Sequence, residues 1–428
     1  MVEYRPVPDA DVPEFQRLLS YAFSPADGHD PIESVEDLPA RATLGDRRGI
    51  YEDDELCCTG IHHWFRLRVR GAFREVPGLA AVSTPPHHRR RGFVGRLLAE
   101  SLAEYRERGA GVCVLWPFNH PFYRRYGWAR CSRYGRVTCA PDALAGIDTA
   151  SDEPNGRFVS CSADDWEALD RVYRATNSQG LAMDRTEAWW RKRVLTGWDG
   201  DPYPTGVERN GRLVGYLVYD IEKGTDDTGK TDDGRRMVVR ELGYIDSSAY
   251  RAVLEFCRYH DSQASEIEFY GPVDARLQDL VRDPRDVEIE IEPGAMARMV
   301  DVSRALSALS YPADIEADLT IAVADDTAGW NDGRFRLSIA DGTGTCEPTD
   351  DGPEGGSGAD VDVGTSADSG SGSVDLTTSI ATLSQVAVGY LSVERAERVG
   401  DFEVASTDAR NTLAAAFPPG EPFLREGF

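Results

Sequence analysis

One stretch, residues 79–127, constrains the fold more than any other part of the sequence. It begins with an apolar run at 79–83, passes through two prolines and the basic segment 87–92, and continues with apolar residues at helical spacing up to residue 108. A second apolar run follows at 112–116. Two strands that are joined by a helical crossover lie parallel in one sheet. The stretch therefore predicts a βαβ unit and an α/β domain built around it.

The segments on either side extend this domain. Residues 12–23 carry apolar side chains at helical spacing and follow Asp11, which is a suitable N-cap. Strands are expected within 57–73 and at 131–139, and the second of these is expected to close the domain. The polar segment 141–156 contains proline and glycine and is predicted to be a linker.

Two further blocks follow this linker. The block 157–295 repeats the order of strands and helices without a visible sequence repeat, and its Asn210-Gly211 pair predicts a hairpin turn. A third block opens with a helix that is expected to start at residue 299 and to stop at Pro312. Residues 341–373 are poor in hydrophobic side chains and rich in Gly, Ser and Asp, which predicts a disordered loop.

The net charge of the chain limits the kinds of partner and of cellular environment that are expected. The chain has 428 residues, a formal net charge of −26 and a pI near 4.7, and its only lysines are at positions 192, 223 and 230. An acidic surface with almost no lysine is typical of a halophilic protein from a high-salt cytoplasm, and a docking surface for cations is the alternative. The basic residues cluster at one place only, so nucleic acid is not expected as a partner.

No membrane segment or export signal is expected. The sequence has no apolar run of about 18 residues, and its acidic N-terminus lacks the apolar core of a signal peptide. These features predict a cytoplasmic protein. The eight cysteines include no C-x-x-C pair and have no histidines at ligand spacing. Reduced structural thiols are therefore expected, without disulfides or a metal site.

The basic segment before the predicted helix predicts an anion site. Arg89, Arg90 and Arg91 precede a helix that begins at Gly92, and the first amides of a helix have no partner inside it. Cations are unfavourable at a helix N-terminus, so an arginine run that only contacts solvent is the weaker interpretation. A bound pyrophosphate would remove this unfavourable interaction, because its negative charge suits both the arginines and the helix N-terminus. Because no Gly-Lys-Ser/Thr follows, the segment is not a Walker loop.

Two motifs in this stretch resemble those of the GCN5-related N-acetyltransferases (GNAT). The residues from Arg89 to Val94 resemble the acetyl-CoA motif Arg/Gln-x-x-Gly-x-Gly/Ala, although Val94 stands where that family has a small residue. Residues 122–128 resemble the family's Tyr-x-x-x-Gly-Phe signature, which follows the next strand. The two motifs together are more specific than either one alone.

Features of the third block indicate a resemblance to one particular family among the GNAT proteins. The segments 298–309, 311–312 and 330–335, together with a terminal Phe428, are similar to the enhanced-intracellular-survival (Eis) family. The resemblance implies an α/β (α+β) protein in which two tandem GNAT-like folds precede a sterol-carrier-protein-like domain.

Three domains follow from this resemblance. Residues 1–145 are expected to form a GNAT domain with the acetyl-CoA site, and residues 156–295 a second GNAT-like domain without a cofactor. Residues 296–428 are expected to form the sterol-carrier-protein-like domain, with an acidic disordered loop at about 345–373.

The resemblance also implies roles for individual residues. The amides of Val82 and Thr84 are expected to align the pantetheine arm of acetyl-CoA as a pseudo-strand. Tyr123 is expected to protonate the leaving thiolate, because its ordinary pKa of about 10 is close to that of a thiol. Tyr126 is expected to pack the turn. The pyrophosphate is expected to be held by the residues of the arginine motif, Arg89, Arg90, Arg91, Gly92, Phe93 and Val94.

A catalytic base is not evident on the central strand, because residues 79–83 include no acid. The resemblance offers the α-carboxylate of Phe428, which the third domain would bring to the active site; a frayed chain end is the alternative. With an ordinary pKa of about 3.5, this carboxylate is expected to orient the substrate ammonium and to accept its proton through water. Packing or solvent contact, and not base catalysis, is expected of the histidines His62, His63, His87 and His88.

The implied function is that of an acetyl-CoA-dependent N-acetyltransferase. Its acceptor is expected to be a primary amine of a cationic small molecule or of a lysine side chain, which attacks directly in a ternary complex. The resemblance also implies a homo-oligomer, with a hexamer as the expected size. The alternative is a protein that binds a lipid or another apolar ligand and has a vestigial acetyltransferase domain. An enzyme that prefers longer acyl chains stays open, because the sequence does not size the acyl pocket.

Overall fold

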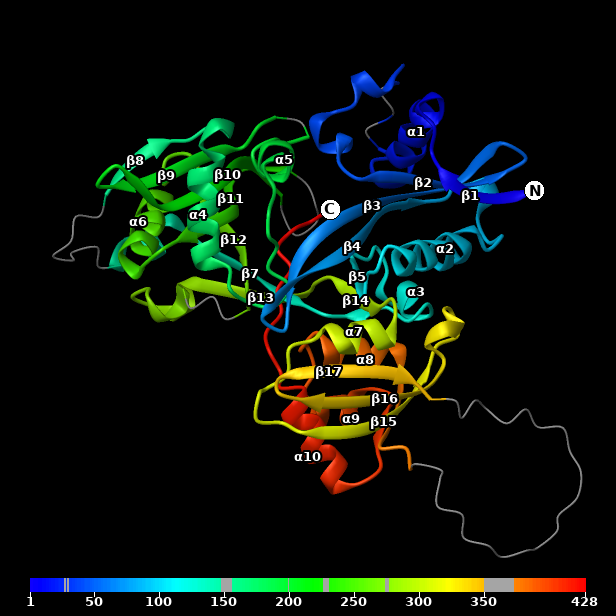
Figure 1. The fold of residues 1–428 in the computed structure, drawn as a ribbon. Coiled ribbons are helices and arrows are strands. Elements are labelled where there is room, and N and C mark those ends of the chain that lie inside the picture. The colour runs from blue at the N-terminus through cyan, green and yellow to red at the C-terminus, as the bar shows by residue number, and fades with distance from the viewer. Residues whose placement is uncertain are drawn as a thin grey trace, which may run out of the picture.

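The computed structural model describes residues 1–26, 28, 31–147, 156–198, 200–225, 231–273, 277–349 and 373–428. These residues form three β-sheets with helices packed on them, which confirms the expected mixed α/β class. Figure 1 shows that each sheet belongs to a separate body: the first is blue and cyan, the second green, and the third yellow to red. We call these bodies the first, second and third unit.

The first unit is a seven-stranded sheet with a helix on each face. Tyr51 packs against Phe15 of α1, whereas its neighbour Ile50 packs against Leu97 of α2, so the two helices cover opposite faces. Its helices are α1 (Val12–Phe23), α2 (Phe93–Glu107) and the short α3 (His120–Arg124). Its strands, in spatial order, are β1 (Val2–Pro6), β2 (Asp46–Glu52), β3 (Glu55–Val69), β4 (Ala72–Ser83), β5 (Val112–Leu115), β14 (Met296–Met299) and β6 (Ala129–Arg130).

The second unit repeats this architecture. Its β11–α6–β12 segment is a parallel strand pair joined by a helix, as β4–α2–β5 is in the first unit. The predicted Asn210-Gly211 turn joins β9 to β10, and both residues have positive φ. Its helices are α4 (Trp166–Thr176), α5 (Glu187–Trp189) and α6 (Ser247–Arg258). Its strands, in spatial order, are β13 (Val287–Pro293), β7 (Arg133–Cys139), β12 (Glu266–Gly271), β11 (Thr231–Tyr244), β10 (Arg212–Thr225), β9 (Tyr203–Arg209) and β8 (Arg157–Ser160).

The third unit is a five-stranded sheet packed on helices. Its strands, in spatial order, are β17 (Thr343–Pro348), β16 (Gly333–Ala340), β15 (Ala317–Ala324), β18 (Leu376–Ser379) and β19 (Phe402–Val404). Its helices are α7 (Val302–Ala308), α8 (Ile380–Ala387), α9 (Val393–Val399) and α10 (Thr407–Ala416).

Two expectations about the third unit need correction. The helix expected from residue 299 begins only at Val302, because Met299 is the last residue of β14. The loop expected at 341–373 is shorter at its start, because residues 343–348 pair with β16 as strand β17. Residues 350–372 of that loop, like residues 148–155 of the expected linker, lie outside the described residues.

The first two units exchange strands, which the sequence interpretation missed. The strand expected to close the first domain, β7, lies instead in the second sheet between β12 and β13. In return, β14 lies in the first sheet between β5 and β6. Both exchanged strands occupy the same position relative to the parallel pair of their sheet. Apolar periodicity indicates that a segment is a strand, but it does not indicate which sheet the strand joins.

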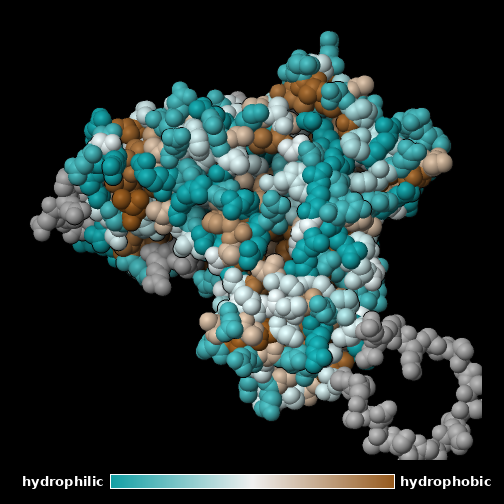
Figure 2. All heavy atoms as spheres, viewed as in Figure 1, coloured by the Kyte–Doolittle hydropathy of each residue, from teal (hydrophilic) through white to brown (hydrophobic). Residues whose placement is uncertain are grey.

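Membrane-length helices and disulfides are both missing from the described residues. Across the described ranges, no helix has both the length and the apolar character needed to cross a membrane. Polar side chains cover most of the face that is visible in Figure 2. All eight cysteines belong to described ranges and are free thiols; Cys161 is half-buried and the others are buried.

A buried ion pair joins the exchanged strand β14 to the third unit and generates a stability prediction. Arg298 Nη2 lies 2.8 and 2.6 Å from the two carboxylate oxygens of Asp325, and neither side chain is accessible to solvent beyond 1%. Asp325→Asn keeps the volume but leaves the arginine without a counterion. Loss of one partner of a buried pair costs about 3–5 kcal/mol. We therefore expect a clear loss in the free energy of unfolding, measured by urea denaturation.

The control for this prediction is the solvent-exposed pair between Asp318 and Arg336, which are 52% and 63% exposed. Asp318→Asn should change the free energy of unfolding by no more than about 1 kcal/mol. Similar losses in both variants would contradict the role assigned to the buried pair.

Candidate active site

The two central strands of the first sheet separate and leave an opening between them. The strands β4 and β5 pair only at Gly78 with Val114 and at Leu79 with Leu115, although β4 continues to Ser83. A bulge opposite β3 and the left-handed conformation of Ala81, with a φ of 54°, turn β4 away at this point. The β5-facing backbone groups beyond Leu79 therefore have no strand partner and can bind an extended ligand.

The predicted pantetheine-aligning residues lie along this opening. Val82 is half-buried and packs with Val94 of α2. The hydroxyl of Thr84 is buried without a hydrogen-bond partner, and its carbonyl oxygen accepts a hydrogen bond from Arg89 Nε at 3.0 Å. The side chain of Arg89 is thus held at the end of β4, where the opening meets the start of α2.

The arginines of the basic turn differ in whether they have hydrogen-bond or ion-pair partners. Gly92 is the N-cap of α2 with a φ of 86°, a conformation that favours glycine. Arg90 also has a positive φ, of 64°, and its exposed side chain has no ion pair or hydrogen bond with the described residues. Arg91, in contrast, binds both carboxylate oxygens of Glu52 at 2.8 and 2.6 Å. Arg89 and Arg90 are therefore the arginines best able to bind an anion, because the side chain of Arg91 is already paired with Glu52 of β2.

Beside this turn lies the one group of potential metal ligands among the described residues. The ligand atoms of Glu55, His87 and His88 lie within 4.8 Å of one another. His88 is buried, and its Nε2 atom lies 3.0 Å from Glu55 Oε1. A hydrogen bond between them accounts for the arrangement and anchors the turn to β3, as the sequence analysis expected for these histidines.

Tyr123 lies on the α2 side of the opening. It belongs to the same buried cluster as Leu79 and Leu115, the last residues at which β4 and β5 pair. The short helix that carries it is capped by Asn119, whose Oδ1 accepts a hydrogen bond from Phe122 N at 2.9 Å. Burial raises the pKa of Tyr123 well above its ordinary value, so the hydroxyl keeps its proton, and the match to the pKa of a thiol that was expected from the ordinary value is absent in this structure. No described residue hydrogen-bonds to that hydroxyl, which leaves the proton available.

Phe428 lies at the same place on the opposite face of the sheet. Its ring centroid is 4.8 Å from that of Phe65 and 5.6 Å from that of His63. The ring fills the space beside Gly78, where a Cβ atom would come within 2.8 Å of it. Since Gly78 and Leu79 are neighbours on β4 and point to opposite faces, Phe428 and Tyr123 flank the start of the opening from two sides.

A buried ion cluster holds the last residues in position. Glu426 Oε1 accepts hydrogen bonds from Arg185 Nε at 2.8 Å and from the Tyr173 hydroxyl at 3.1 Å. Arg185 also pairs with Glu241 of β11. Burial alone would raise the pKa of Glu241, but the guanidinium of Arg185 lowers it below its ordinary value. Glu241 therefore stays charged beside Arg185, and Arg185 links Glu241 to Glu426.

Backbone contacts complete this attachment. Trp116, directly after β5, donates from Nε1 to the Glu426 carbonyl at 2.6 Å, and Arg193 donates to the Gly427 carbonyl at 2.5 Å. The chain end therefore bridges the first and second units; Figure 1 shows the red C-terminal segment running up between them. None of these contacts was anticipated, because the only sequence signal is a pair of charges between the last phenylalanines.

The adjacent histidines of β3 point to opposite faces. His62 Nε2 lies 3.0 Å from the Ser101 hydroxyl on the α2 side, whereas His63 lies beside Phe428. Burial lowers the pKa of each imidazole to about 3, so both are neutral at pH 7. The packing role expected of His62 agrees with this geometry. The position of His63 next to the chain end was not foreseen.

A cavity of about 910 Å³ has His63, Phe65 and Trp189 in its wall, and the rings of His63 and Phe65 contact that of Phe428. Three acids also line it. Asp46 and Asp184 are paired with arginines, but Glu75 is exposed and forms no ion pair with a described residue. The cavity thus has one carboxylate without an arginine partner among the described residues.

Comparisons with known proteins identify the parts of the chain. Residues 3–131 match a model described as "Acetyltransferase (GNAT) domain", residues 181–299 match a second model of the same description, and residues 302–425 match a "Sterol carrier protein domain". The three matches do not overlap.

Relatives extend over most of the chain. An "Uncharacterized N-acetyltransferase" of Streptomyces griseus is 28% identical over 98% of this chain and 97% of its own. The "N-acetyltransferase Eis" of Mycobacterium tuberculosis is 25% identical over 73% of this chain and 76% of its own.

Solved structures share the fold over the full length. A probable N-acyltransferase from Enterococcus faecalis has a TM-score of 0.83 at 20% identity, and Eis1 from Mycobacterium abscessus has a TM-score of 0.72 at 22% identity. Both comparisons cover 100% of each chain. The GNAT fold implies acetyl-CoA as cosubstrate, and the resemblance inferred from the sequence motifs is confirmed. The chain is therefore a GNAT acetyltransferase with a C-terminal sterol-carrier-protein domain, and it is similar to the Eis N-acetyltransferases over most of its length.

Proposed function

We propose that this enzyme transfers the acetyl group of acetyl-CoA to a primary amine by direct attack in a ternary complex. The observation that carries the proposal is the position of Tyr123 and Phe428 on opposite faces of the sheet, where β4 and β5 separate. A thioester that passes through this opening would have a proton donor on one side. On the other side it would have a carboxylate for the incoming amine.

The cofactor side of the proposal uses the opening and the basic turn. The amides of Val82 and Thr84 would bind the pantetheine arm, because β4 has no strand partner there. The exposed guanidiniums of Arg89 and Arg90, together with the free amides at the start of α2, would bind the pyrophosphate. The remaining motif residues, Arg91, Gly92, Phe93 and Val94, would shape this turn.

The chemistry needs one proton donor and one proton acceptor. The amine nitrogen attacks the thioester carbonyl, the carbon–sulfur bond breaks, and Tyr123 gives its proton to the leaving thiolate. The proton lost by the amine passes through water to the carboxylate of Phe428. With an ordinary pKa of about 3.5, this group is a weak base, so its main contribution would be to bind and orient the ammonium.

The acceptor is proposed to be a cationic small molecule or a lysine side chain. The unpaired carboxylate of Glu75 and the terminal carboxylate both favour a positively charged substrate in the neighbouring cavity. The alternative of a lipid carrier with a vestigial transferase domain is not favoured, because relatives that match most of the chain are named N-acetyltransferases.

The proposal also includes the domain boundaries, the oligomeric state and the cellular location of the protein. We propose domains at 1–145, 156–295 and 296–428, although the exchanged strands β7 and β14 cross the first two limits. We also propose a cytoplasmic homo-oligomer, a hexamer by family resemblance, with an acidic surface adapted to high salt. Light scattering of untagged protein should give about six times the 47.1 kDa chain mass; a monomer would contradict this.

Removal of the Tyr123 hydroxyl tests the proposed acid. A positioned general acid contributes about 10²–10⁴-fold to the rate. We expect Tyr123→Phe to lower kcat by at least about 100-fold, with little change in the KM for acetyl-CoA, measured as CoA release with cationic amines and lysine peptides. Tyr126→Phe is the matched control, because that ring packs against Gly95 of α2, and it should retain activity. Full turnover in Tyr123→Phe would refute the assignment.

Extension of the chain end by one alanine tests the proposed carboxylate. The added residue keeps the Phe428 ring but converts its carboxylate into an amide, which cannot hold an ammonium by charge. We expect kcat/KM for the amine to fall at least about tenfold, which corresponds to the loss of about 1.4 kcal/mol. The control is the same alanine added at the N-terminus. Because the added alanine carries its own terminal carboxylate, equal activity of both extended proteins would show that the position of the terminal charge at Phe428 has no role.

A further inference from the structure

The second unit has an opening at the same place in its sheet as the acetyl-CoA opening of the first unit. The strands β11 and β12 pair from Arg236 to Val239, and β11 then continues to Tyr244 without β12. A cavity of about 890 Å³ lies here, with Leu242 and Leu254 in its wall. Its size is typical of small-molecule sites.

The turn at this opening is unsuited to a second CoA. In the first unit, β4 and α2 are joined by the long basic turn, whereas only Ile245 and Asp246 join β11 to α6. The Asp246 carboxylate caps α6 through Ala249 N at 2.8 Å and pairs with Arg209 at 2.9 Å. A carboxylate thus occupies the position at which a pyrophosphate would bind. The cavity must take a ligand that lacks phosphates.

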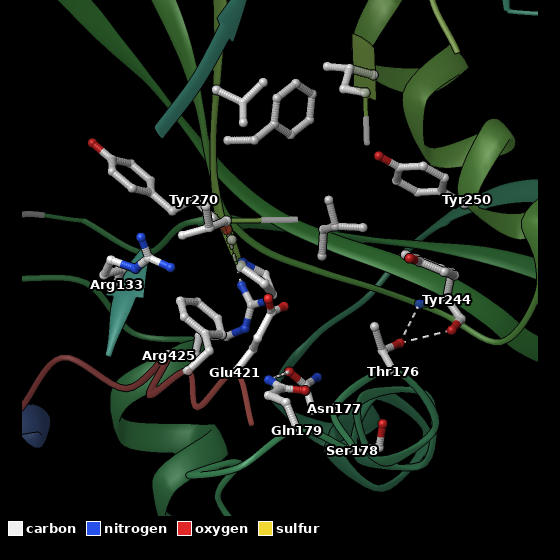
Figure 3. Close-up of a pocket in the computed structure, with 18 of the residues that line it drawn as sticks. Arg133, Thr176, Asn177, Ser178, Gln179, Tyr244, Tyr250, Tyr270, Glu421 and Arg425 are labelled. Carbon is white, nitrogen blue, oxygen red and sulfur yellow. Dashed lines mark hydrogen bonds between the residues drawn. The ribbon is translucent and has the colours of Figure 1, made fainter. Parts of the chain in front are cut away.

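One wall of the cavity is apolar and aromatic. The rings of Tyr244 and Tyr250 lie 4.6 Å apart, and Phe269 of β12 also faces the cavity. Figure 3 shows the two tyrosines on one side of the cavity and Arg133 and Arg425 on the other. A ligand that fills it therefore needs an apolar body.

The opposite wall carries two half-buried cations. Arg133 forms no hydrogen bond or ion pair within the described ranges. Arg425 donates from Nη1 to the Tyr270 carbonyl at 3.3 Å, but its Nε is buried without a partner. An unpaired buried donor is costly, and a charge away from bulk water gains more from a counterion.

The acids near the cavity are distributed unevenly between these two arginines. Glu421 and Asp279 are exposed at its rim and pair with no described arginine. The buried acids Glu241 and Glu426 share Arg185, and the charge of Arg425 also helps to lower the pKa of Glu241. Arg133 is therefore the cation of this wall that has no ion pair with a described acid.

We propose that this cavity is a second small-molecule site, which binds a monocarboxylate with an aromatic or branched aliphatic body. The body packs against the tyrosine wall and the carboxylate meets Arg133 and Arg425. The site is separate from the acetyl-CoA opening and needs no phosphate.

The test uses isothermal titration of the full chain, saturated with CoA so that the first opening is filled. The probes are 4-phenylbutyrate and the matched neutral alcohol 4-phenyl-1-butanol. We expect one 4-phenylbutyrate per chain, bound at least tenfold more tightly than the alcohol. No binding of the acid, equal affinity for the alcohol, or displacement of the acid by CoA would each overturn the proposal.

Variants locate the binding. Arg133→Gln should weaken 4-phenylbutyrate at least tenfold, whereas Arg285→Gln, which changes an exposed arginine of the same unit outside the cavity, should not. Gly271→Leu provides a second route, because a Cβ atom at Gly271 meets open space on the cavity wall. The added side chain should block the acid without altering the unfolding midpoint. Unchanged affinity in both Arg133→Gln and Gly271→Leu would refute the site.

Discussion

The ion pair between Arg185 and Glu426 is the contact on which the arrangement of the active site depends. It is buried, and it fixes the last residues of the chain to a side chain 241 positions earlier. Because Arg185 also holds Glu241, loss of Arg185 would leave two buried carboxylates without this partner, which is costly. The position of Phe428 follows from this attachment together with the bond from Trp116. The second unit therefore supports the chain end beside the opening of the first sheet.

The two GNAT sheets share one architecture but differ where the helix starts beside the opening. In both, a parallel strand pair separates and a helix starts beside the opening. In the first unit, a basic turn and a glycine N-cap leave the helix amides without a side-chain cap. In the second, the Asp246 carboxylate caps the helix. The short turn between strand and helix, and not the strands, therefore sets the charge at this position.

Local patterns in the sequence were sufficient to predict the central βαβ unit. The apolar runs, the glycine N-cap and the arginine motif are each formed by residues that are neighbours in the sequence. Partners that lie far apart were not predictable. The sheet that β7 joins, the pairing of Arg91 with Glu52, and the position of His63 beside Phe428 all depend on tertiary contacts. The terminal residue was suggested by family resemblance alone. The buried charges that hold it leave no periodic signal, since each partner stands alone in its own segment.

The strand exchange has a consequence for how the protein can be made. On the ribosome, β5 emerges long before β14, which is its neighbour in the finished sheet. Until residues 296–299 have been synthesised, β5 has one unpaired edge in the interior of an incomplete sheet, and β7 likewise waits for β12. Such edges are sites of wrong pairing between nascent chains. Completion of both sheets is thus delayed until the same late stage of translation, because β13 and β14 are the last strands of the two sheets to be made.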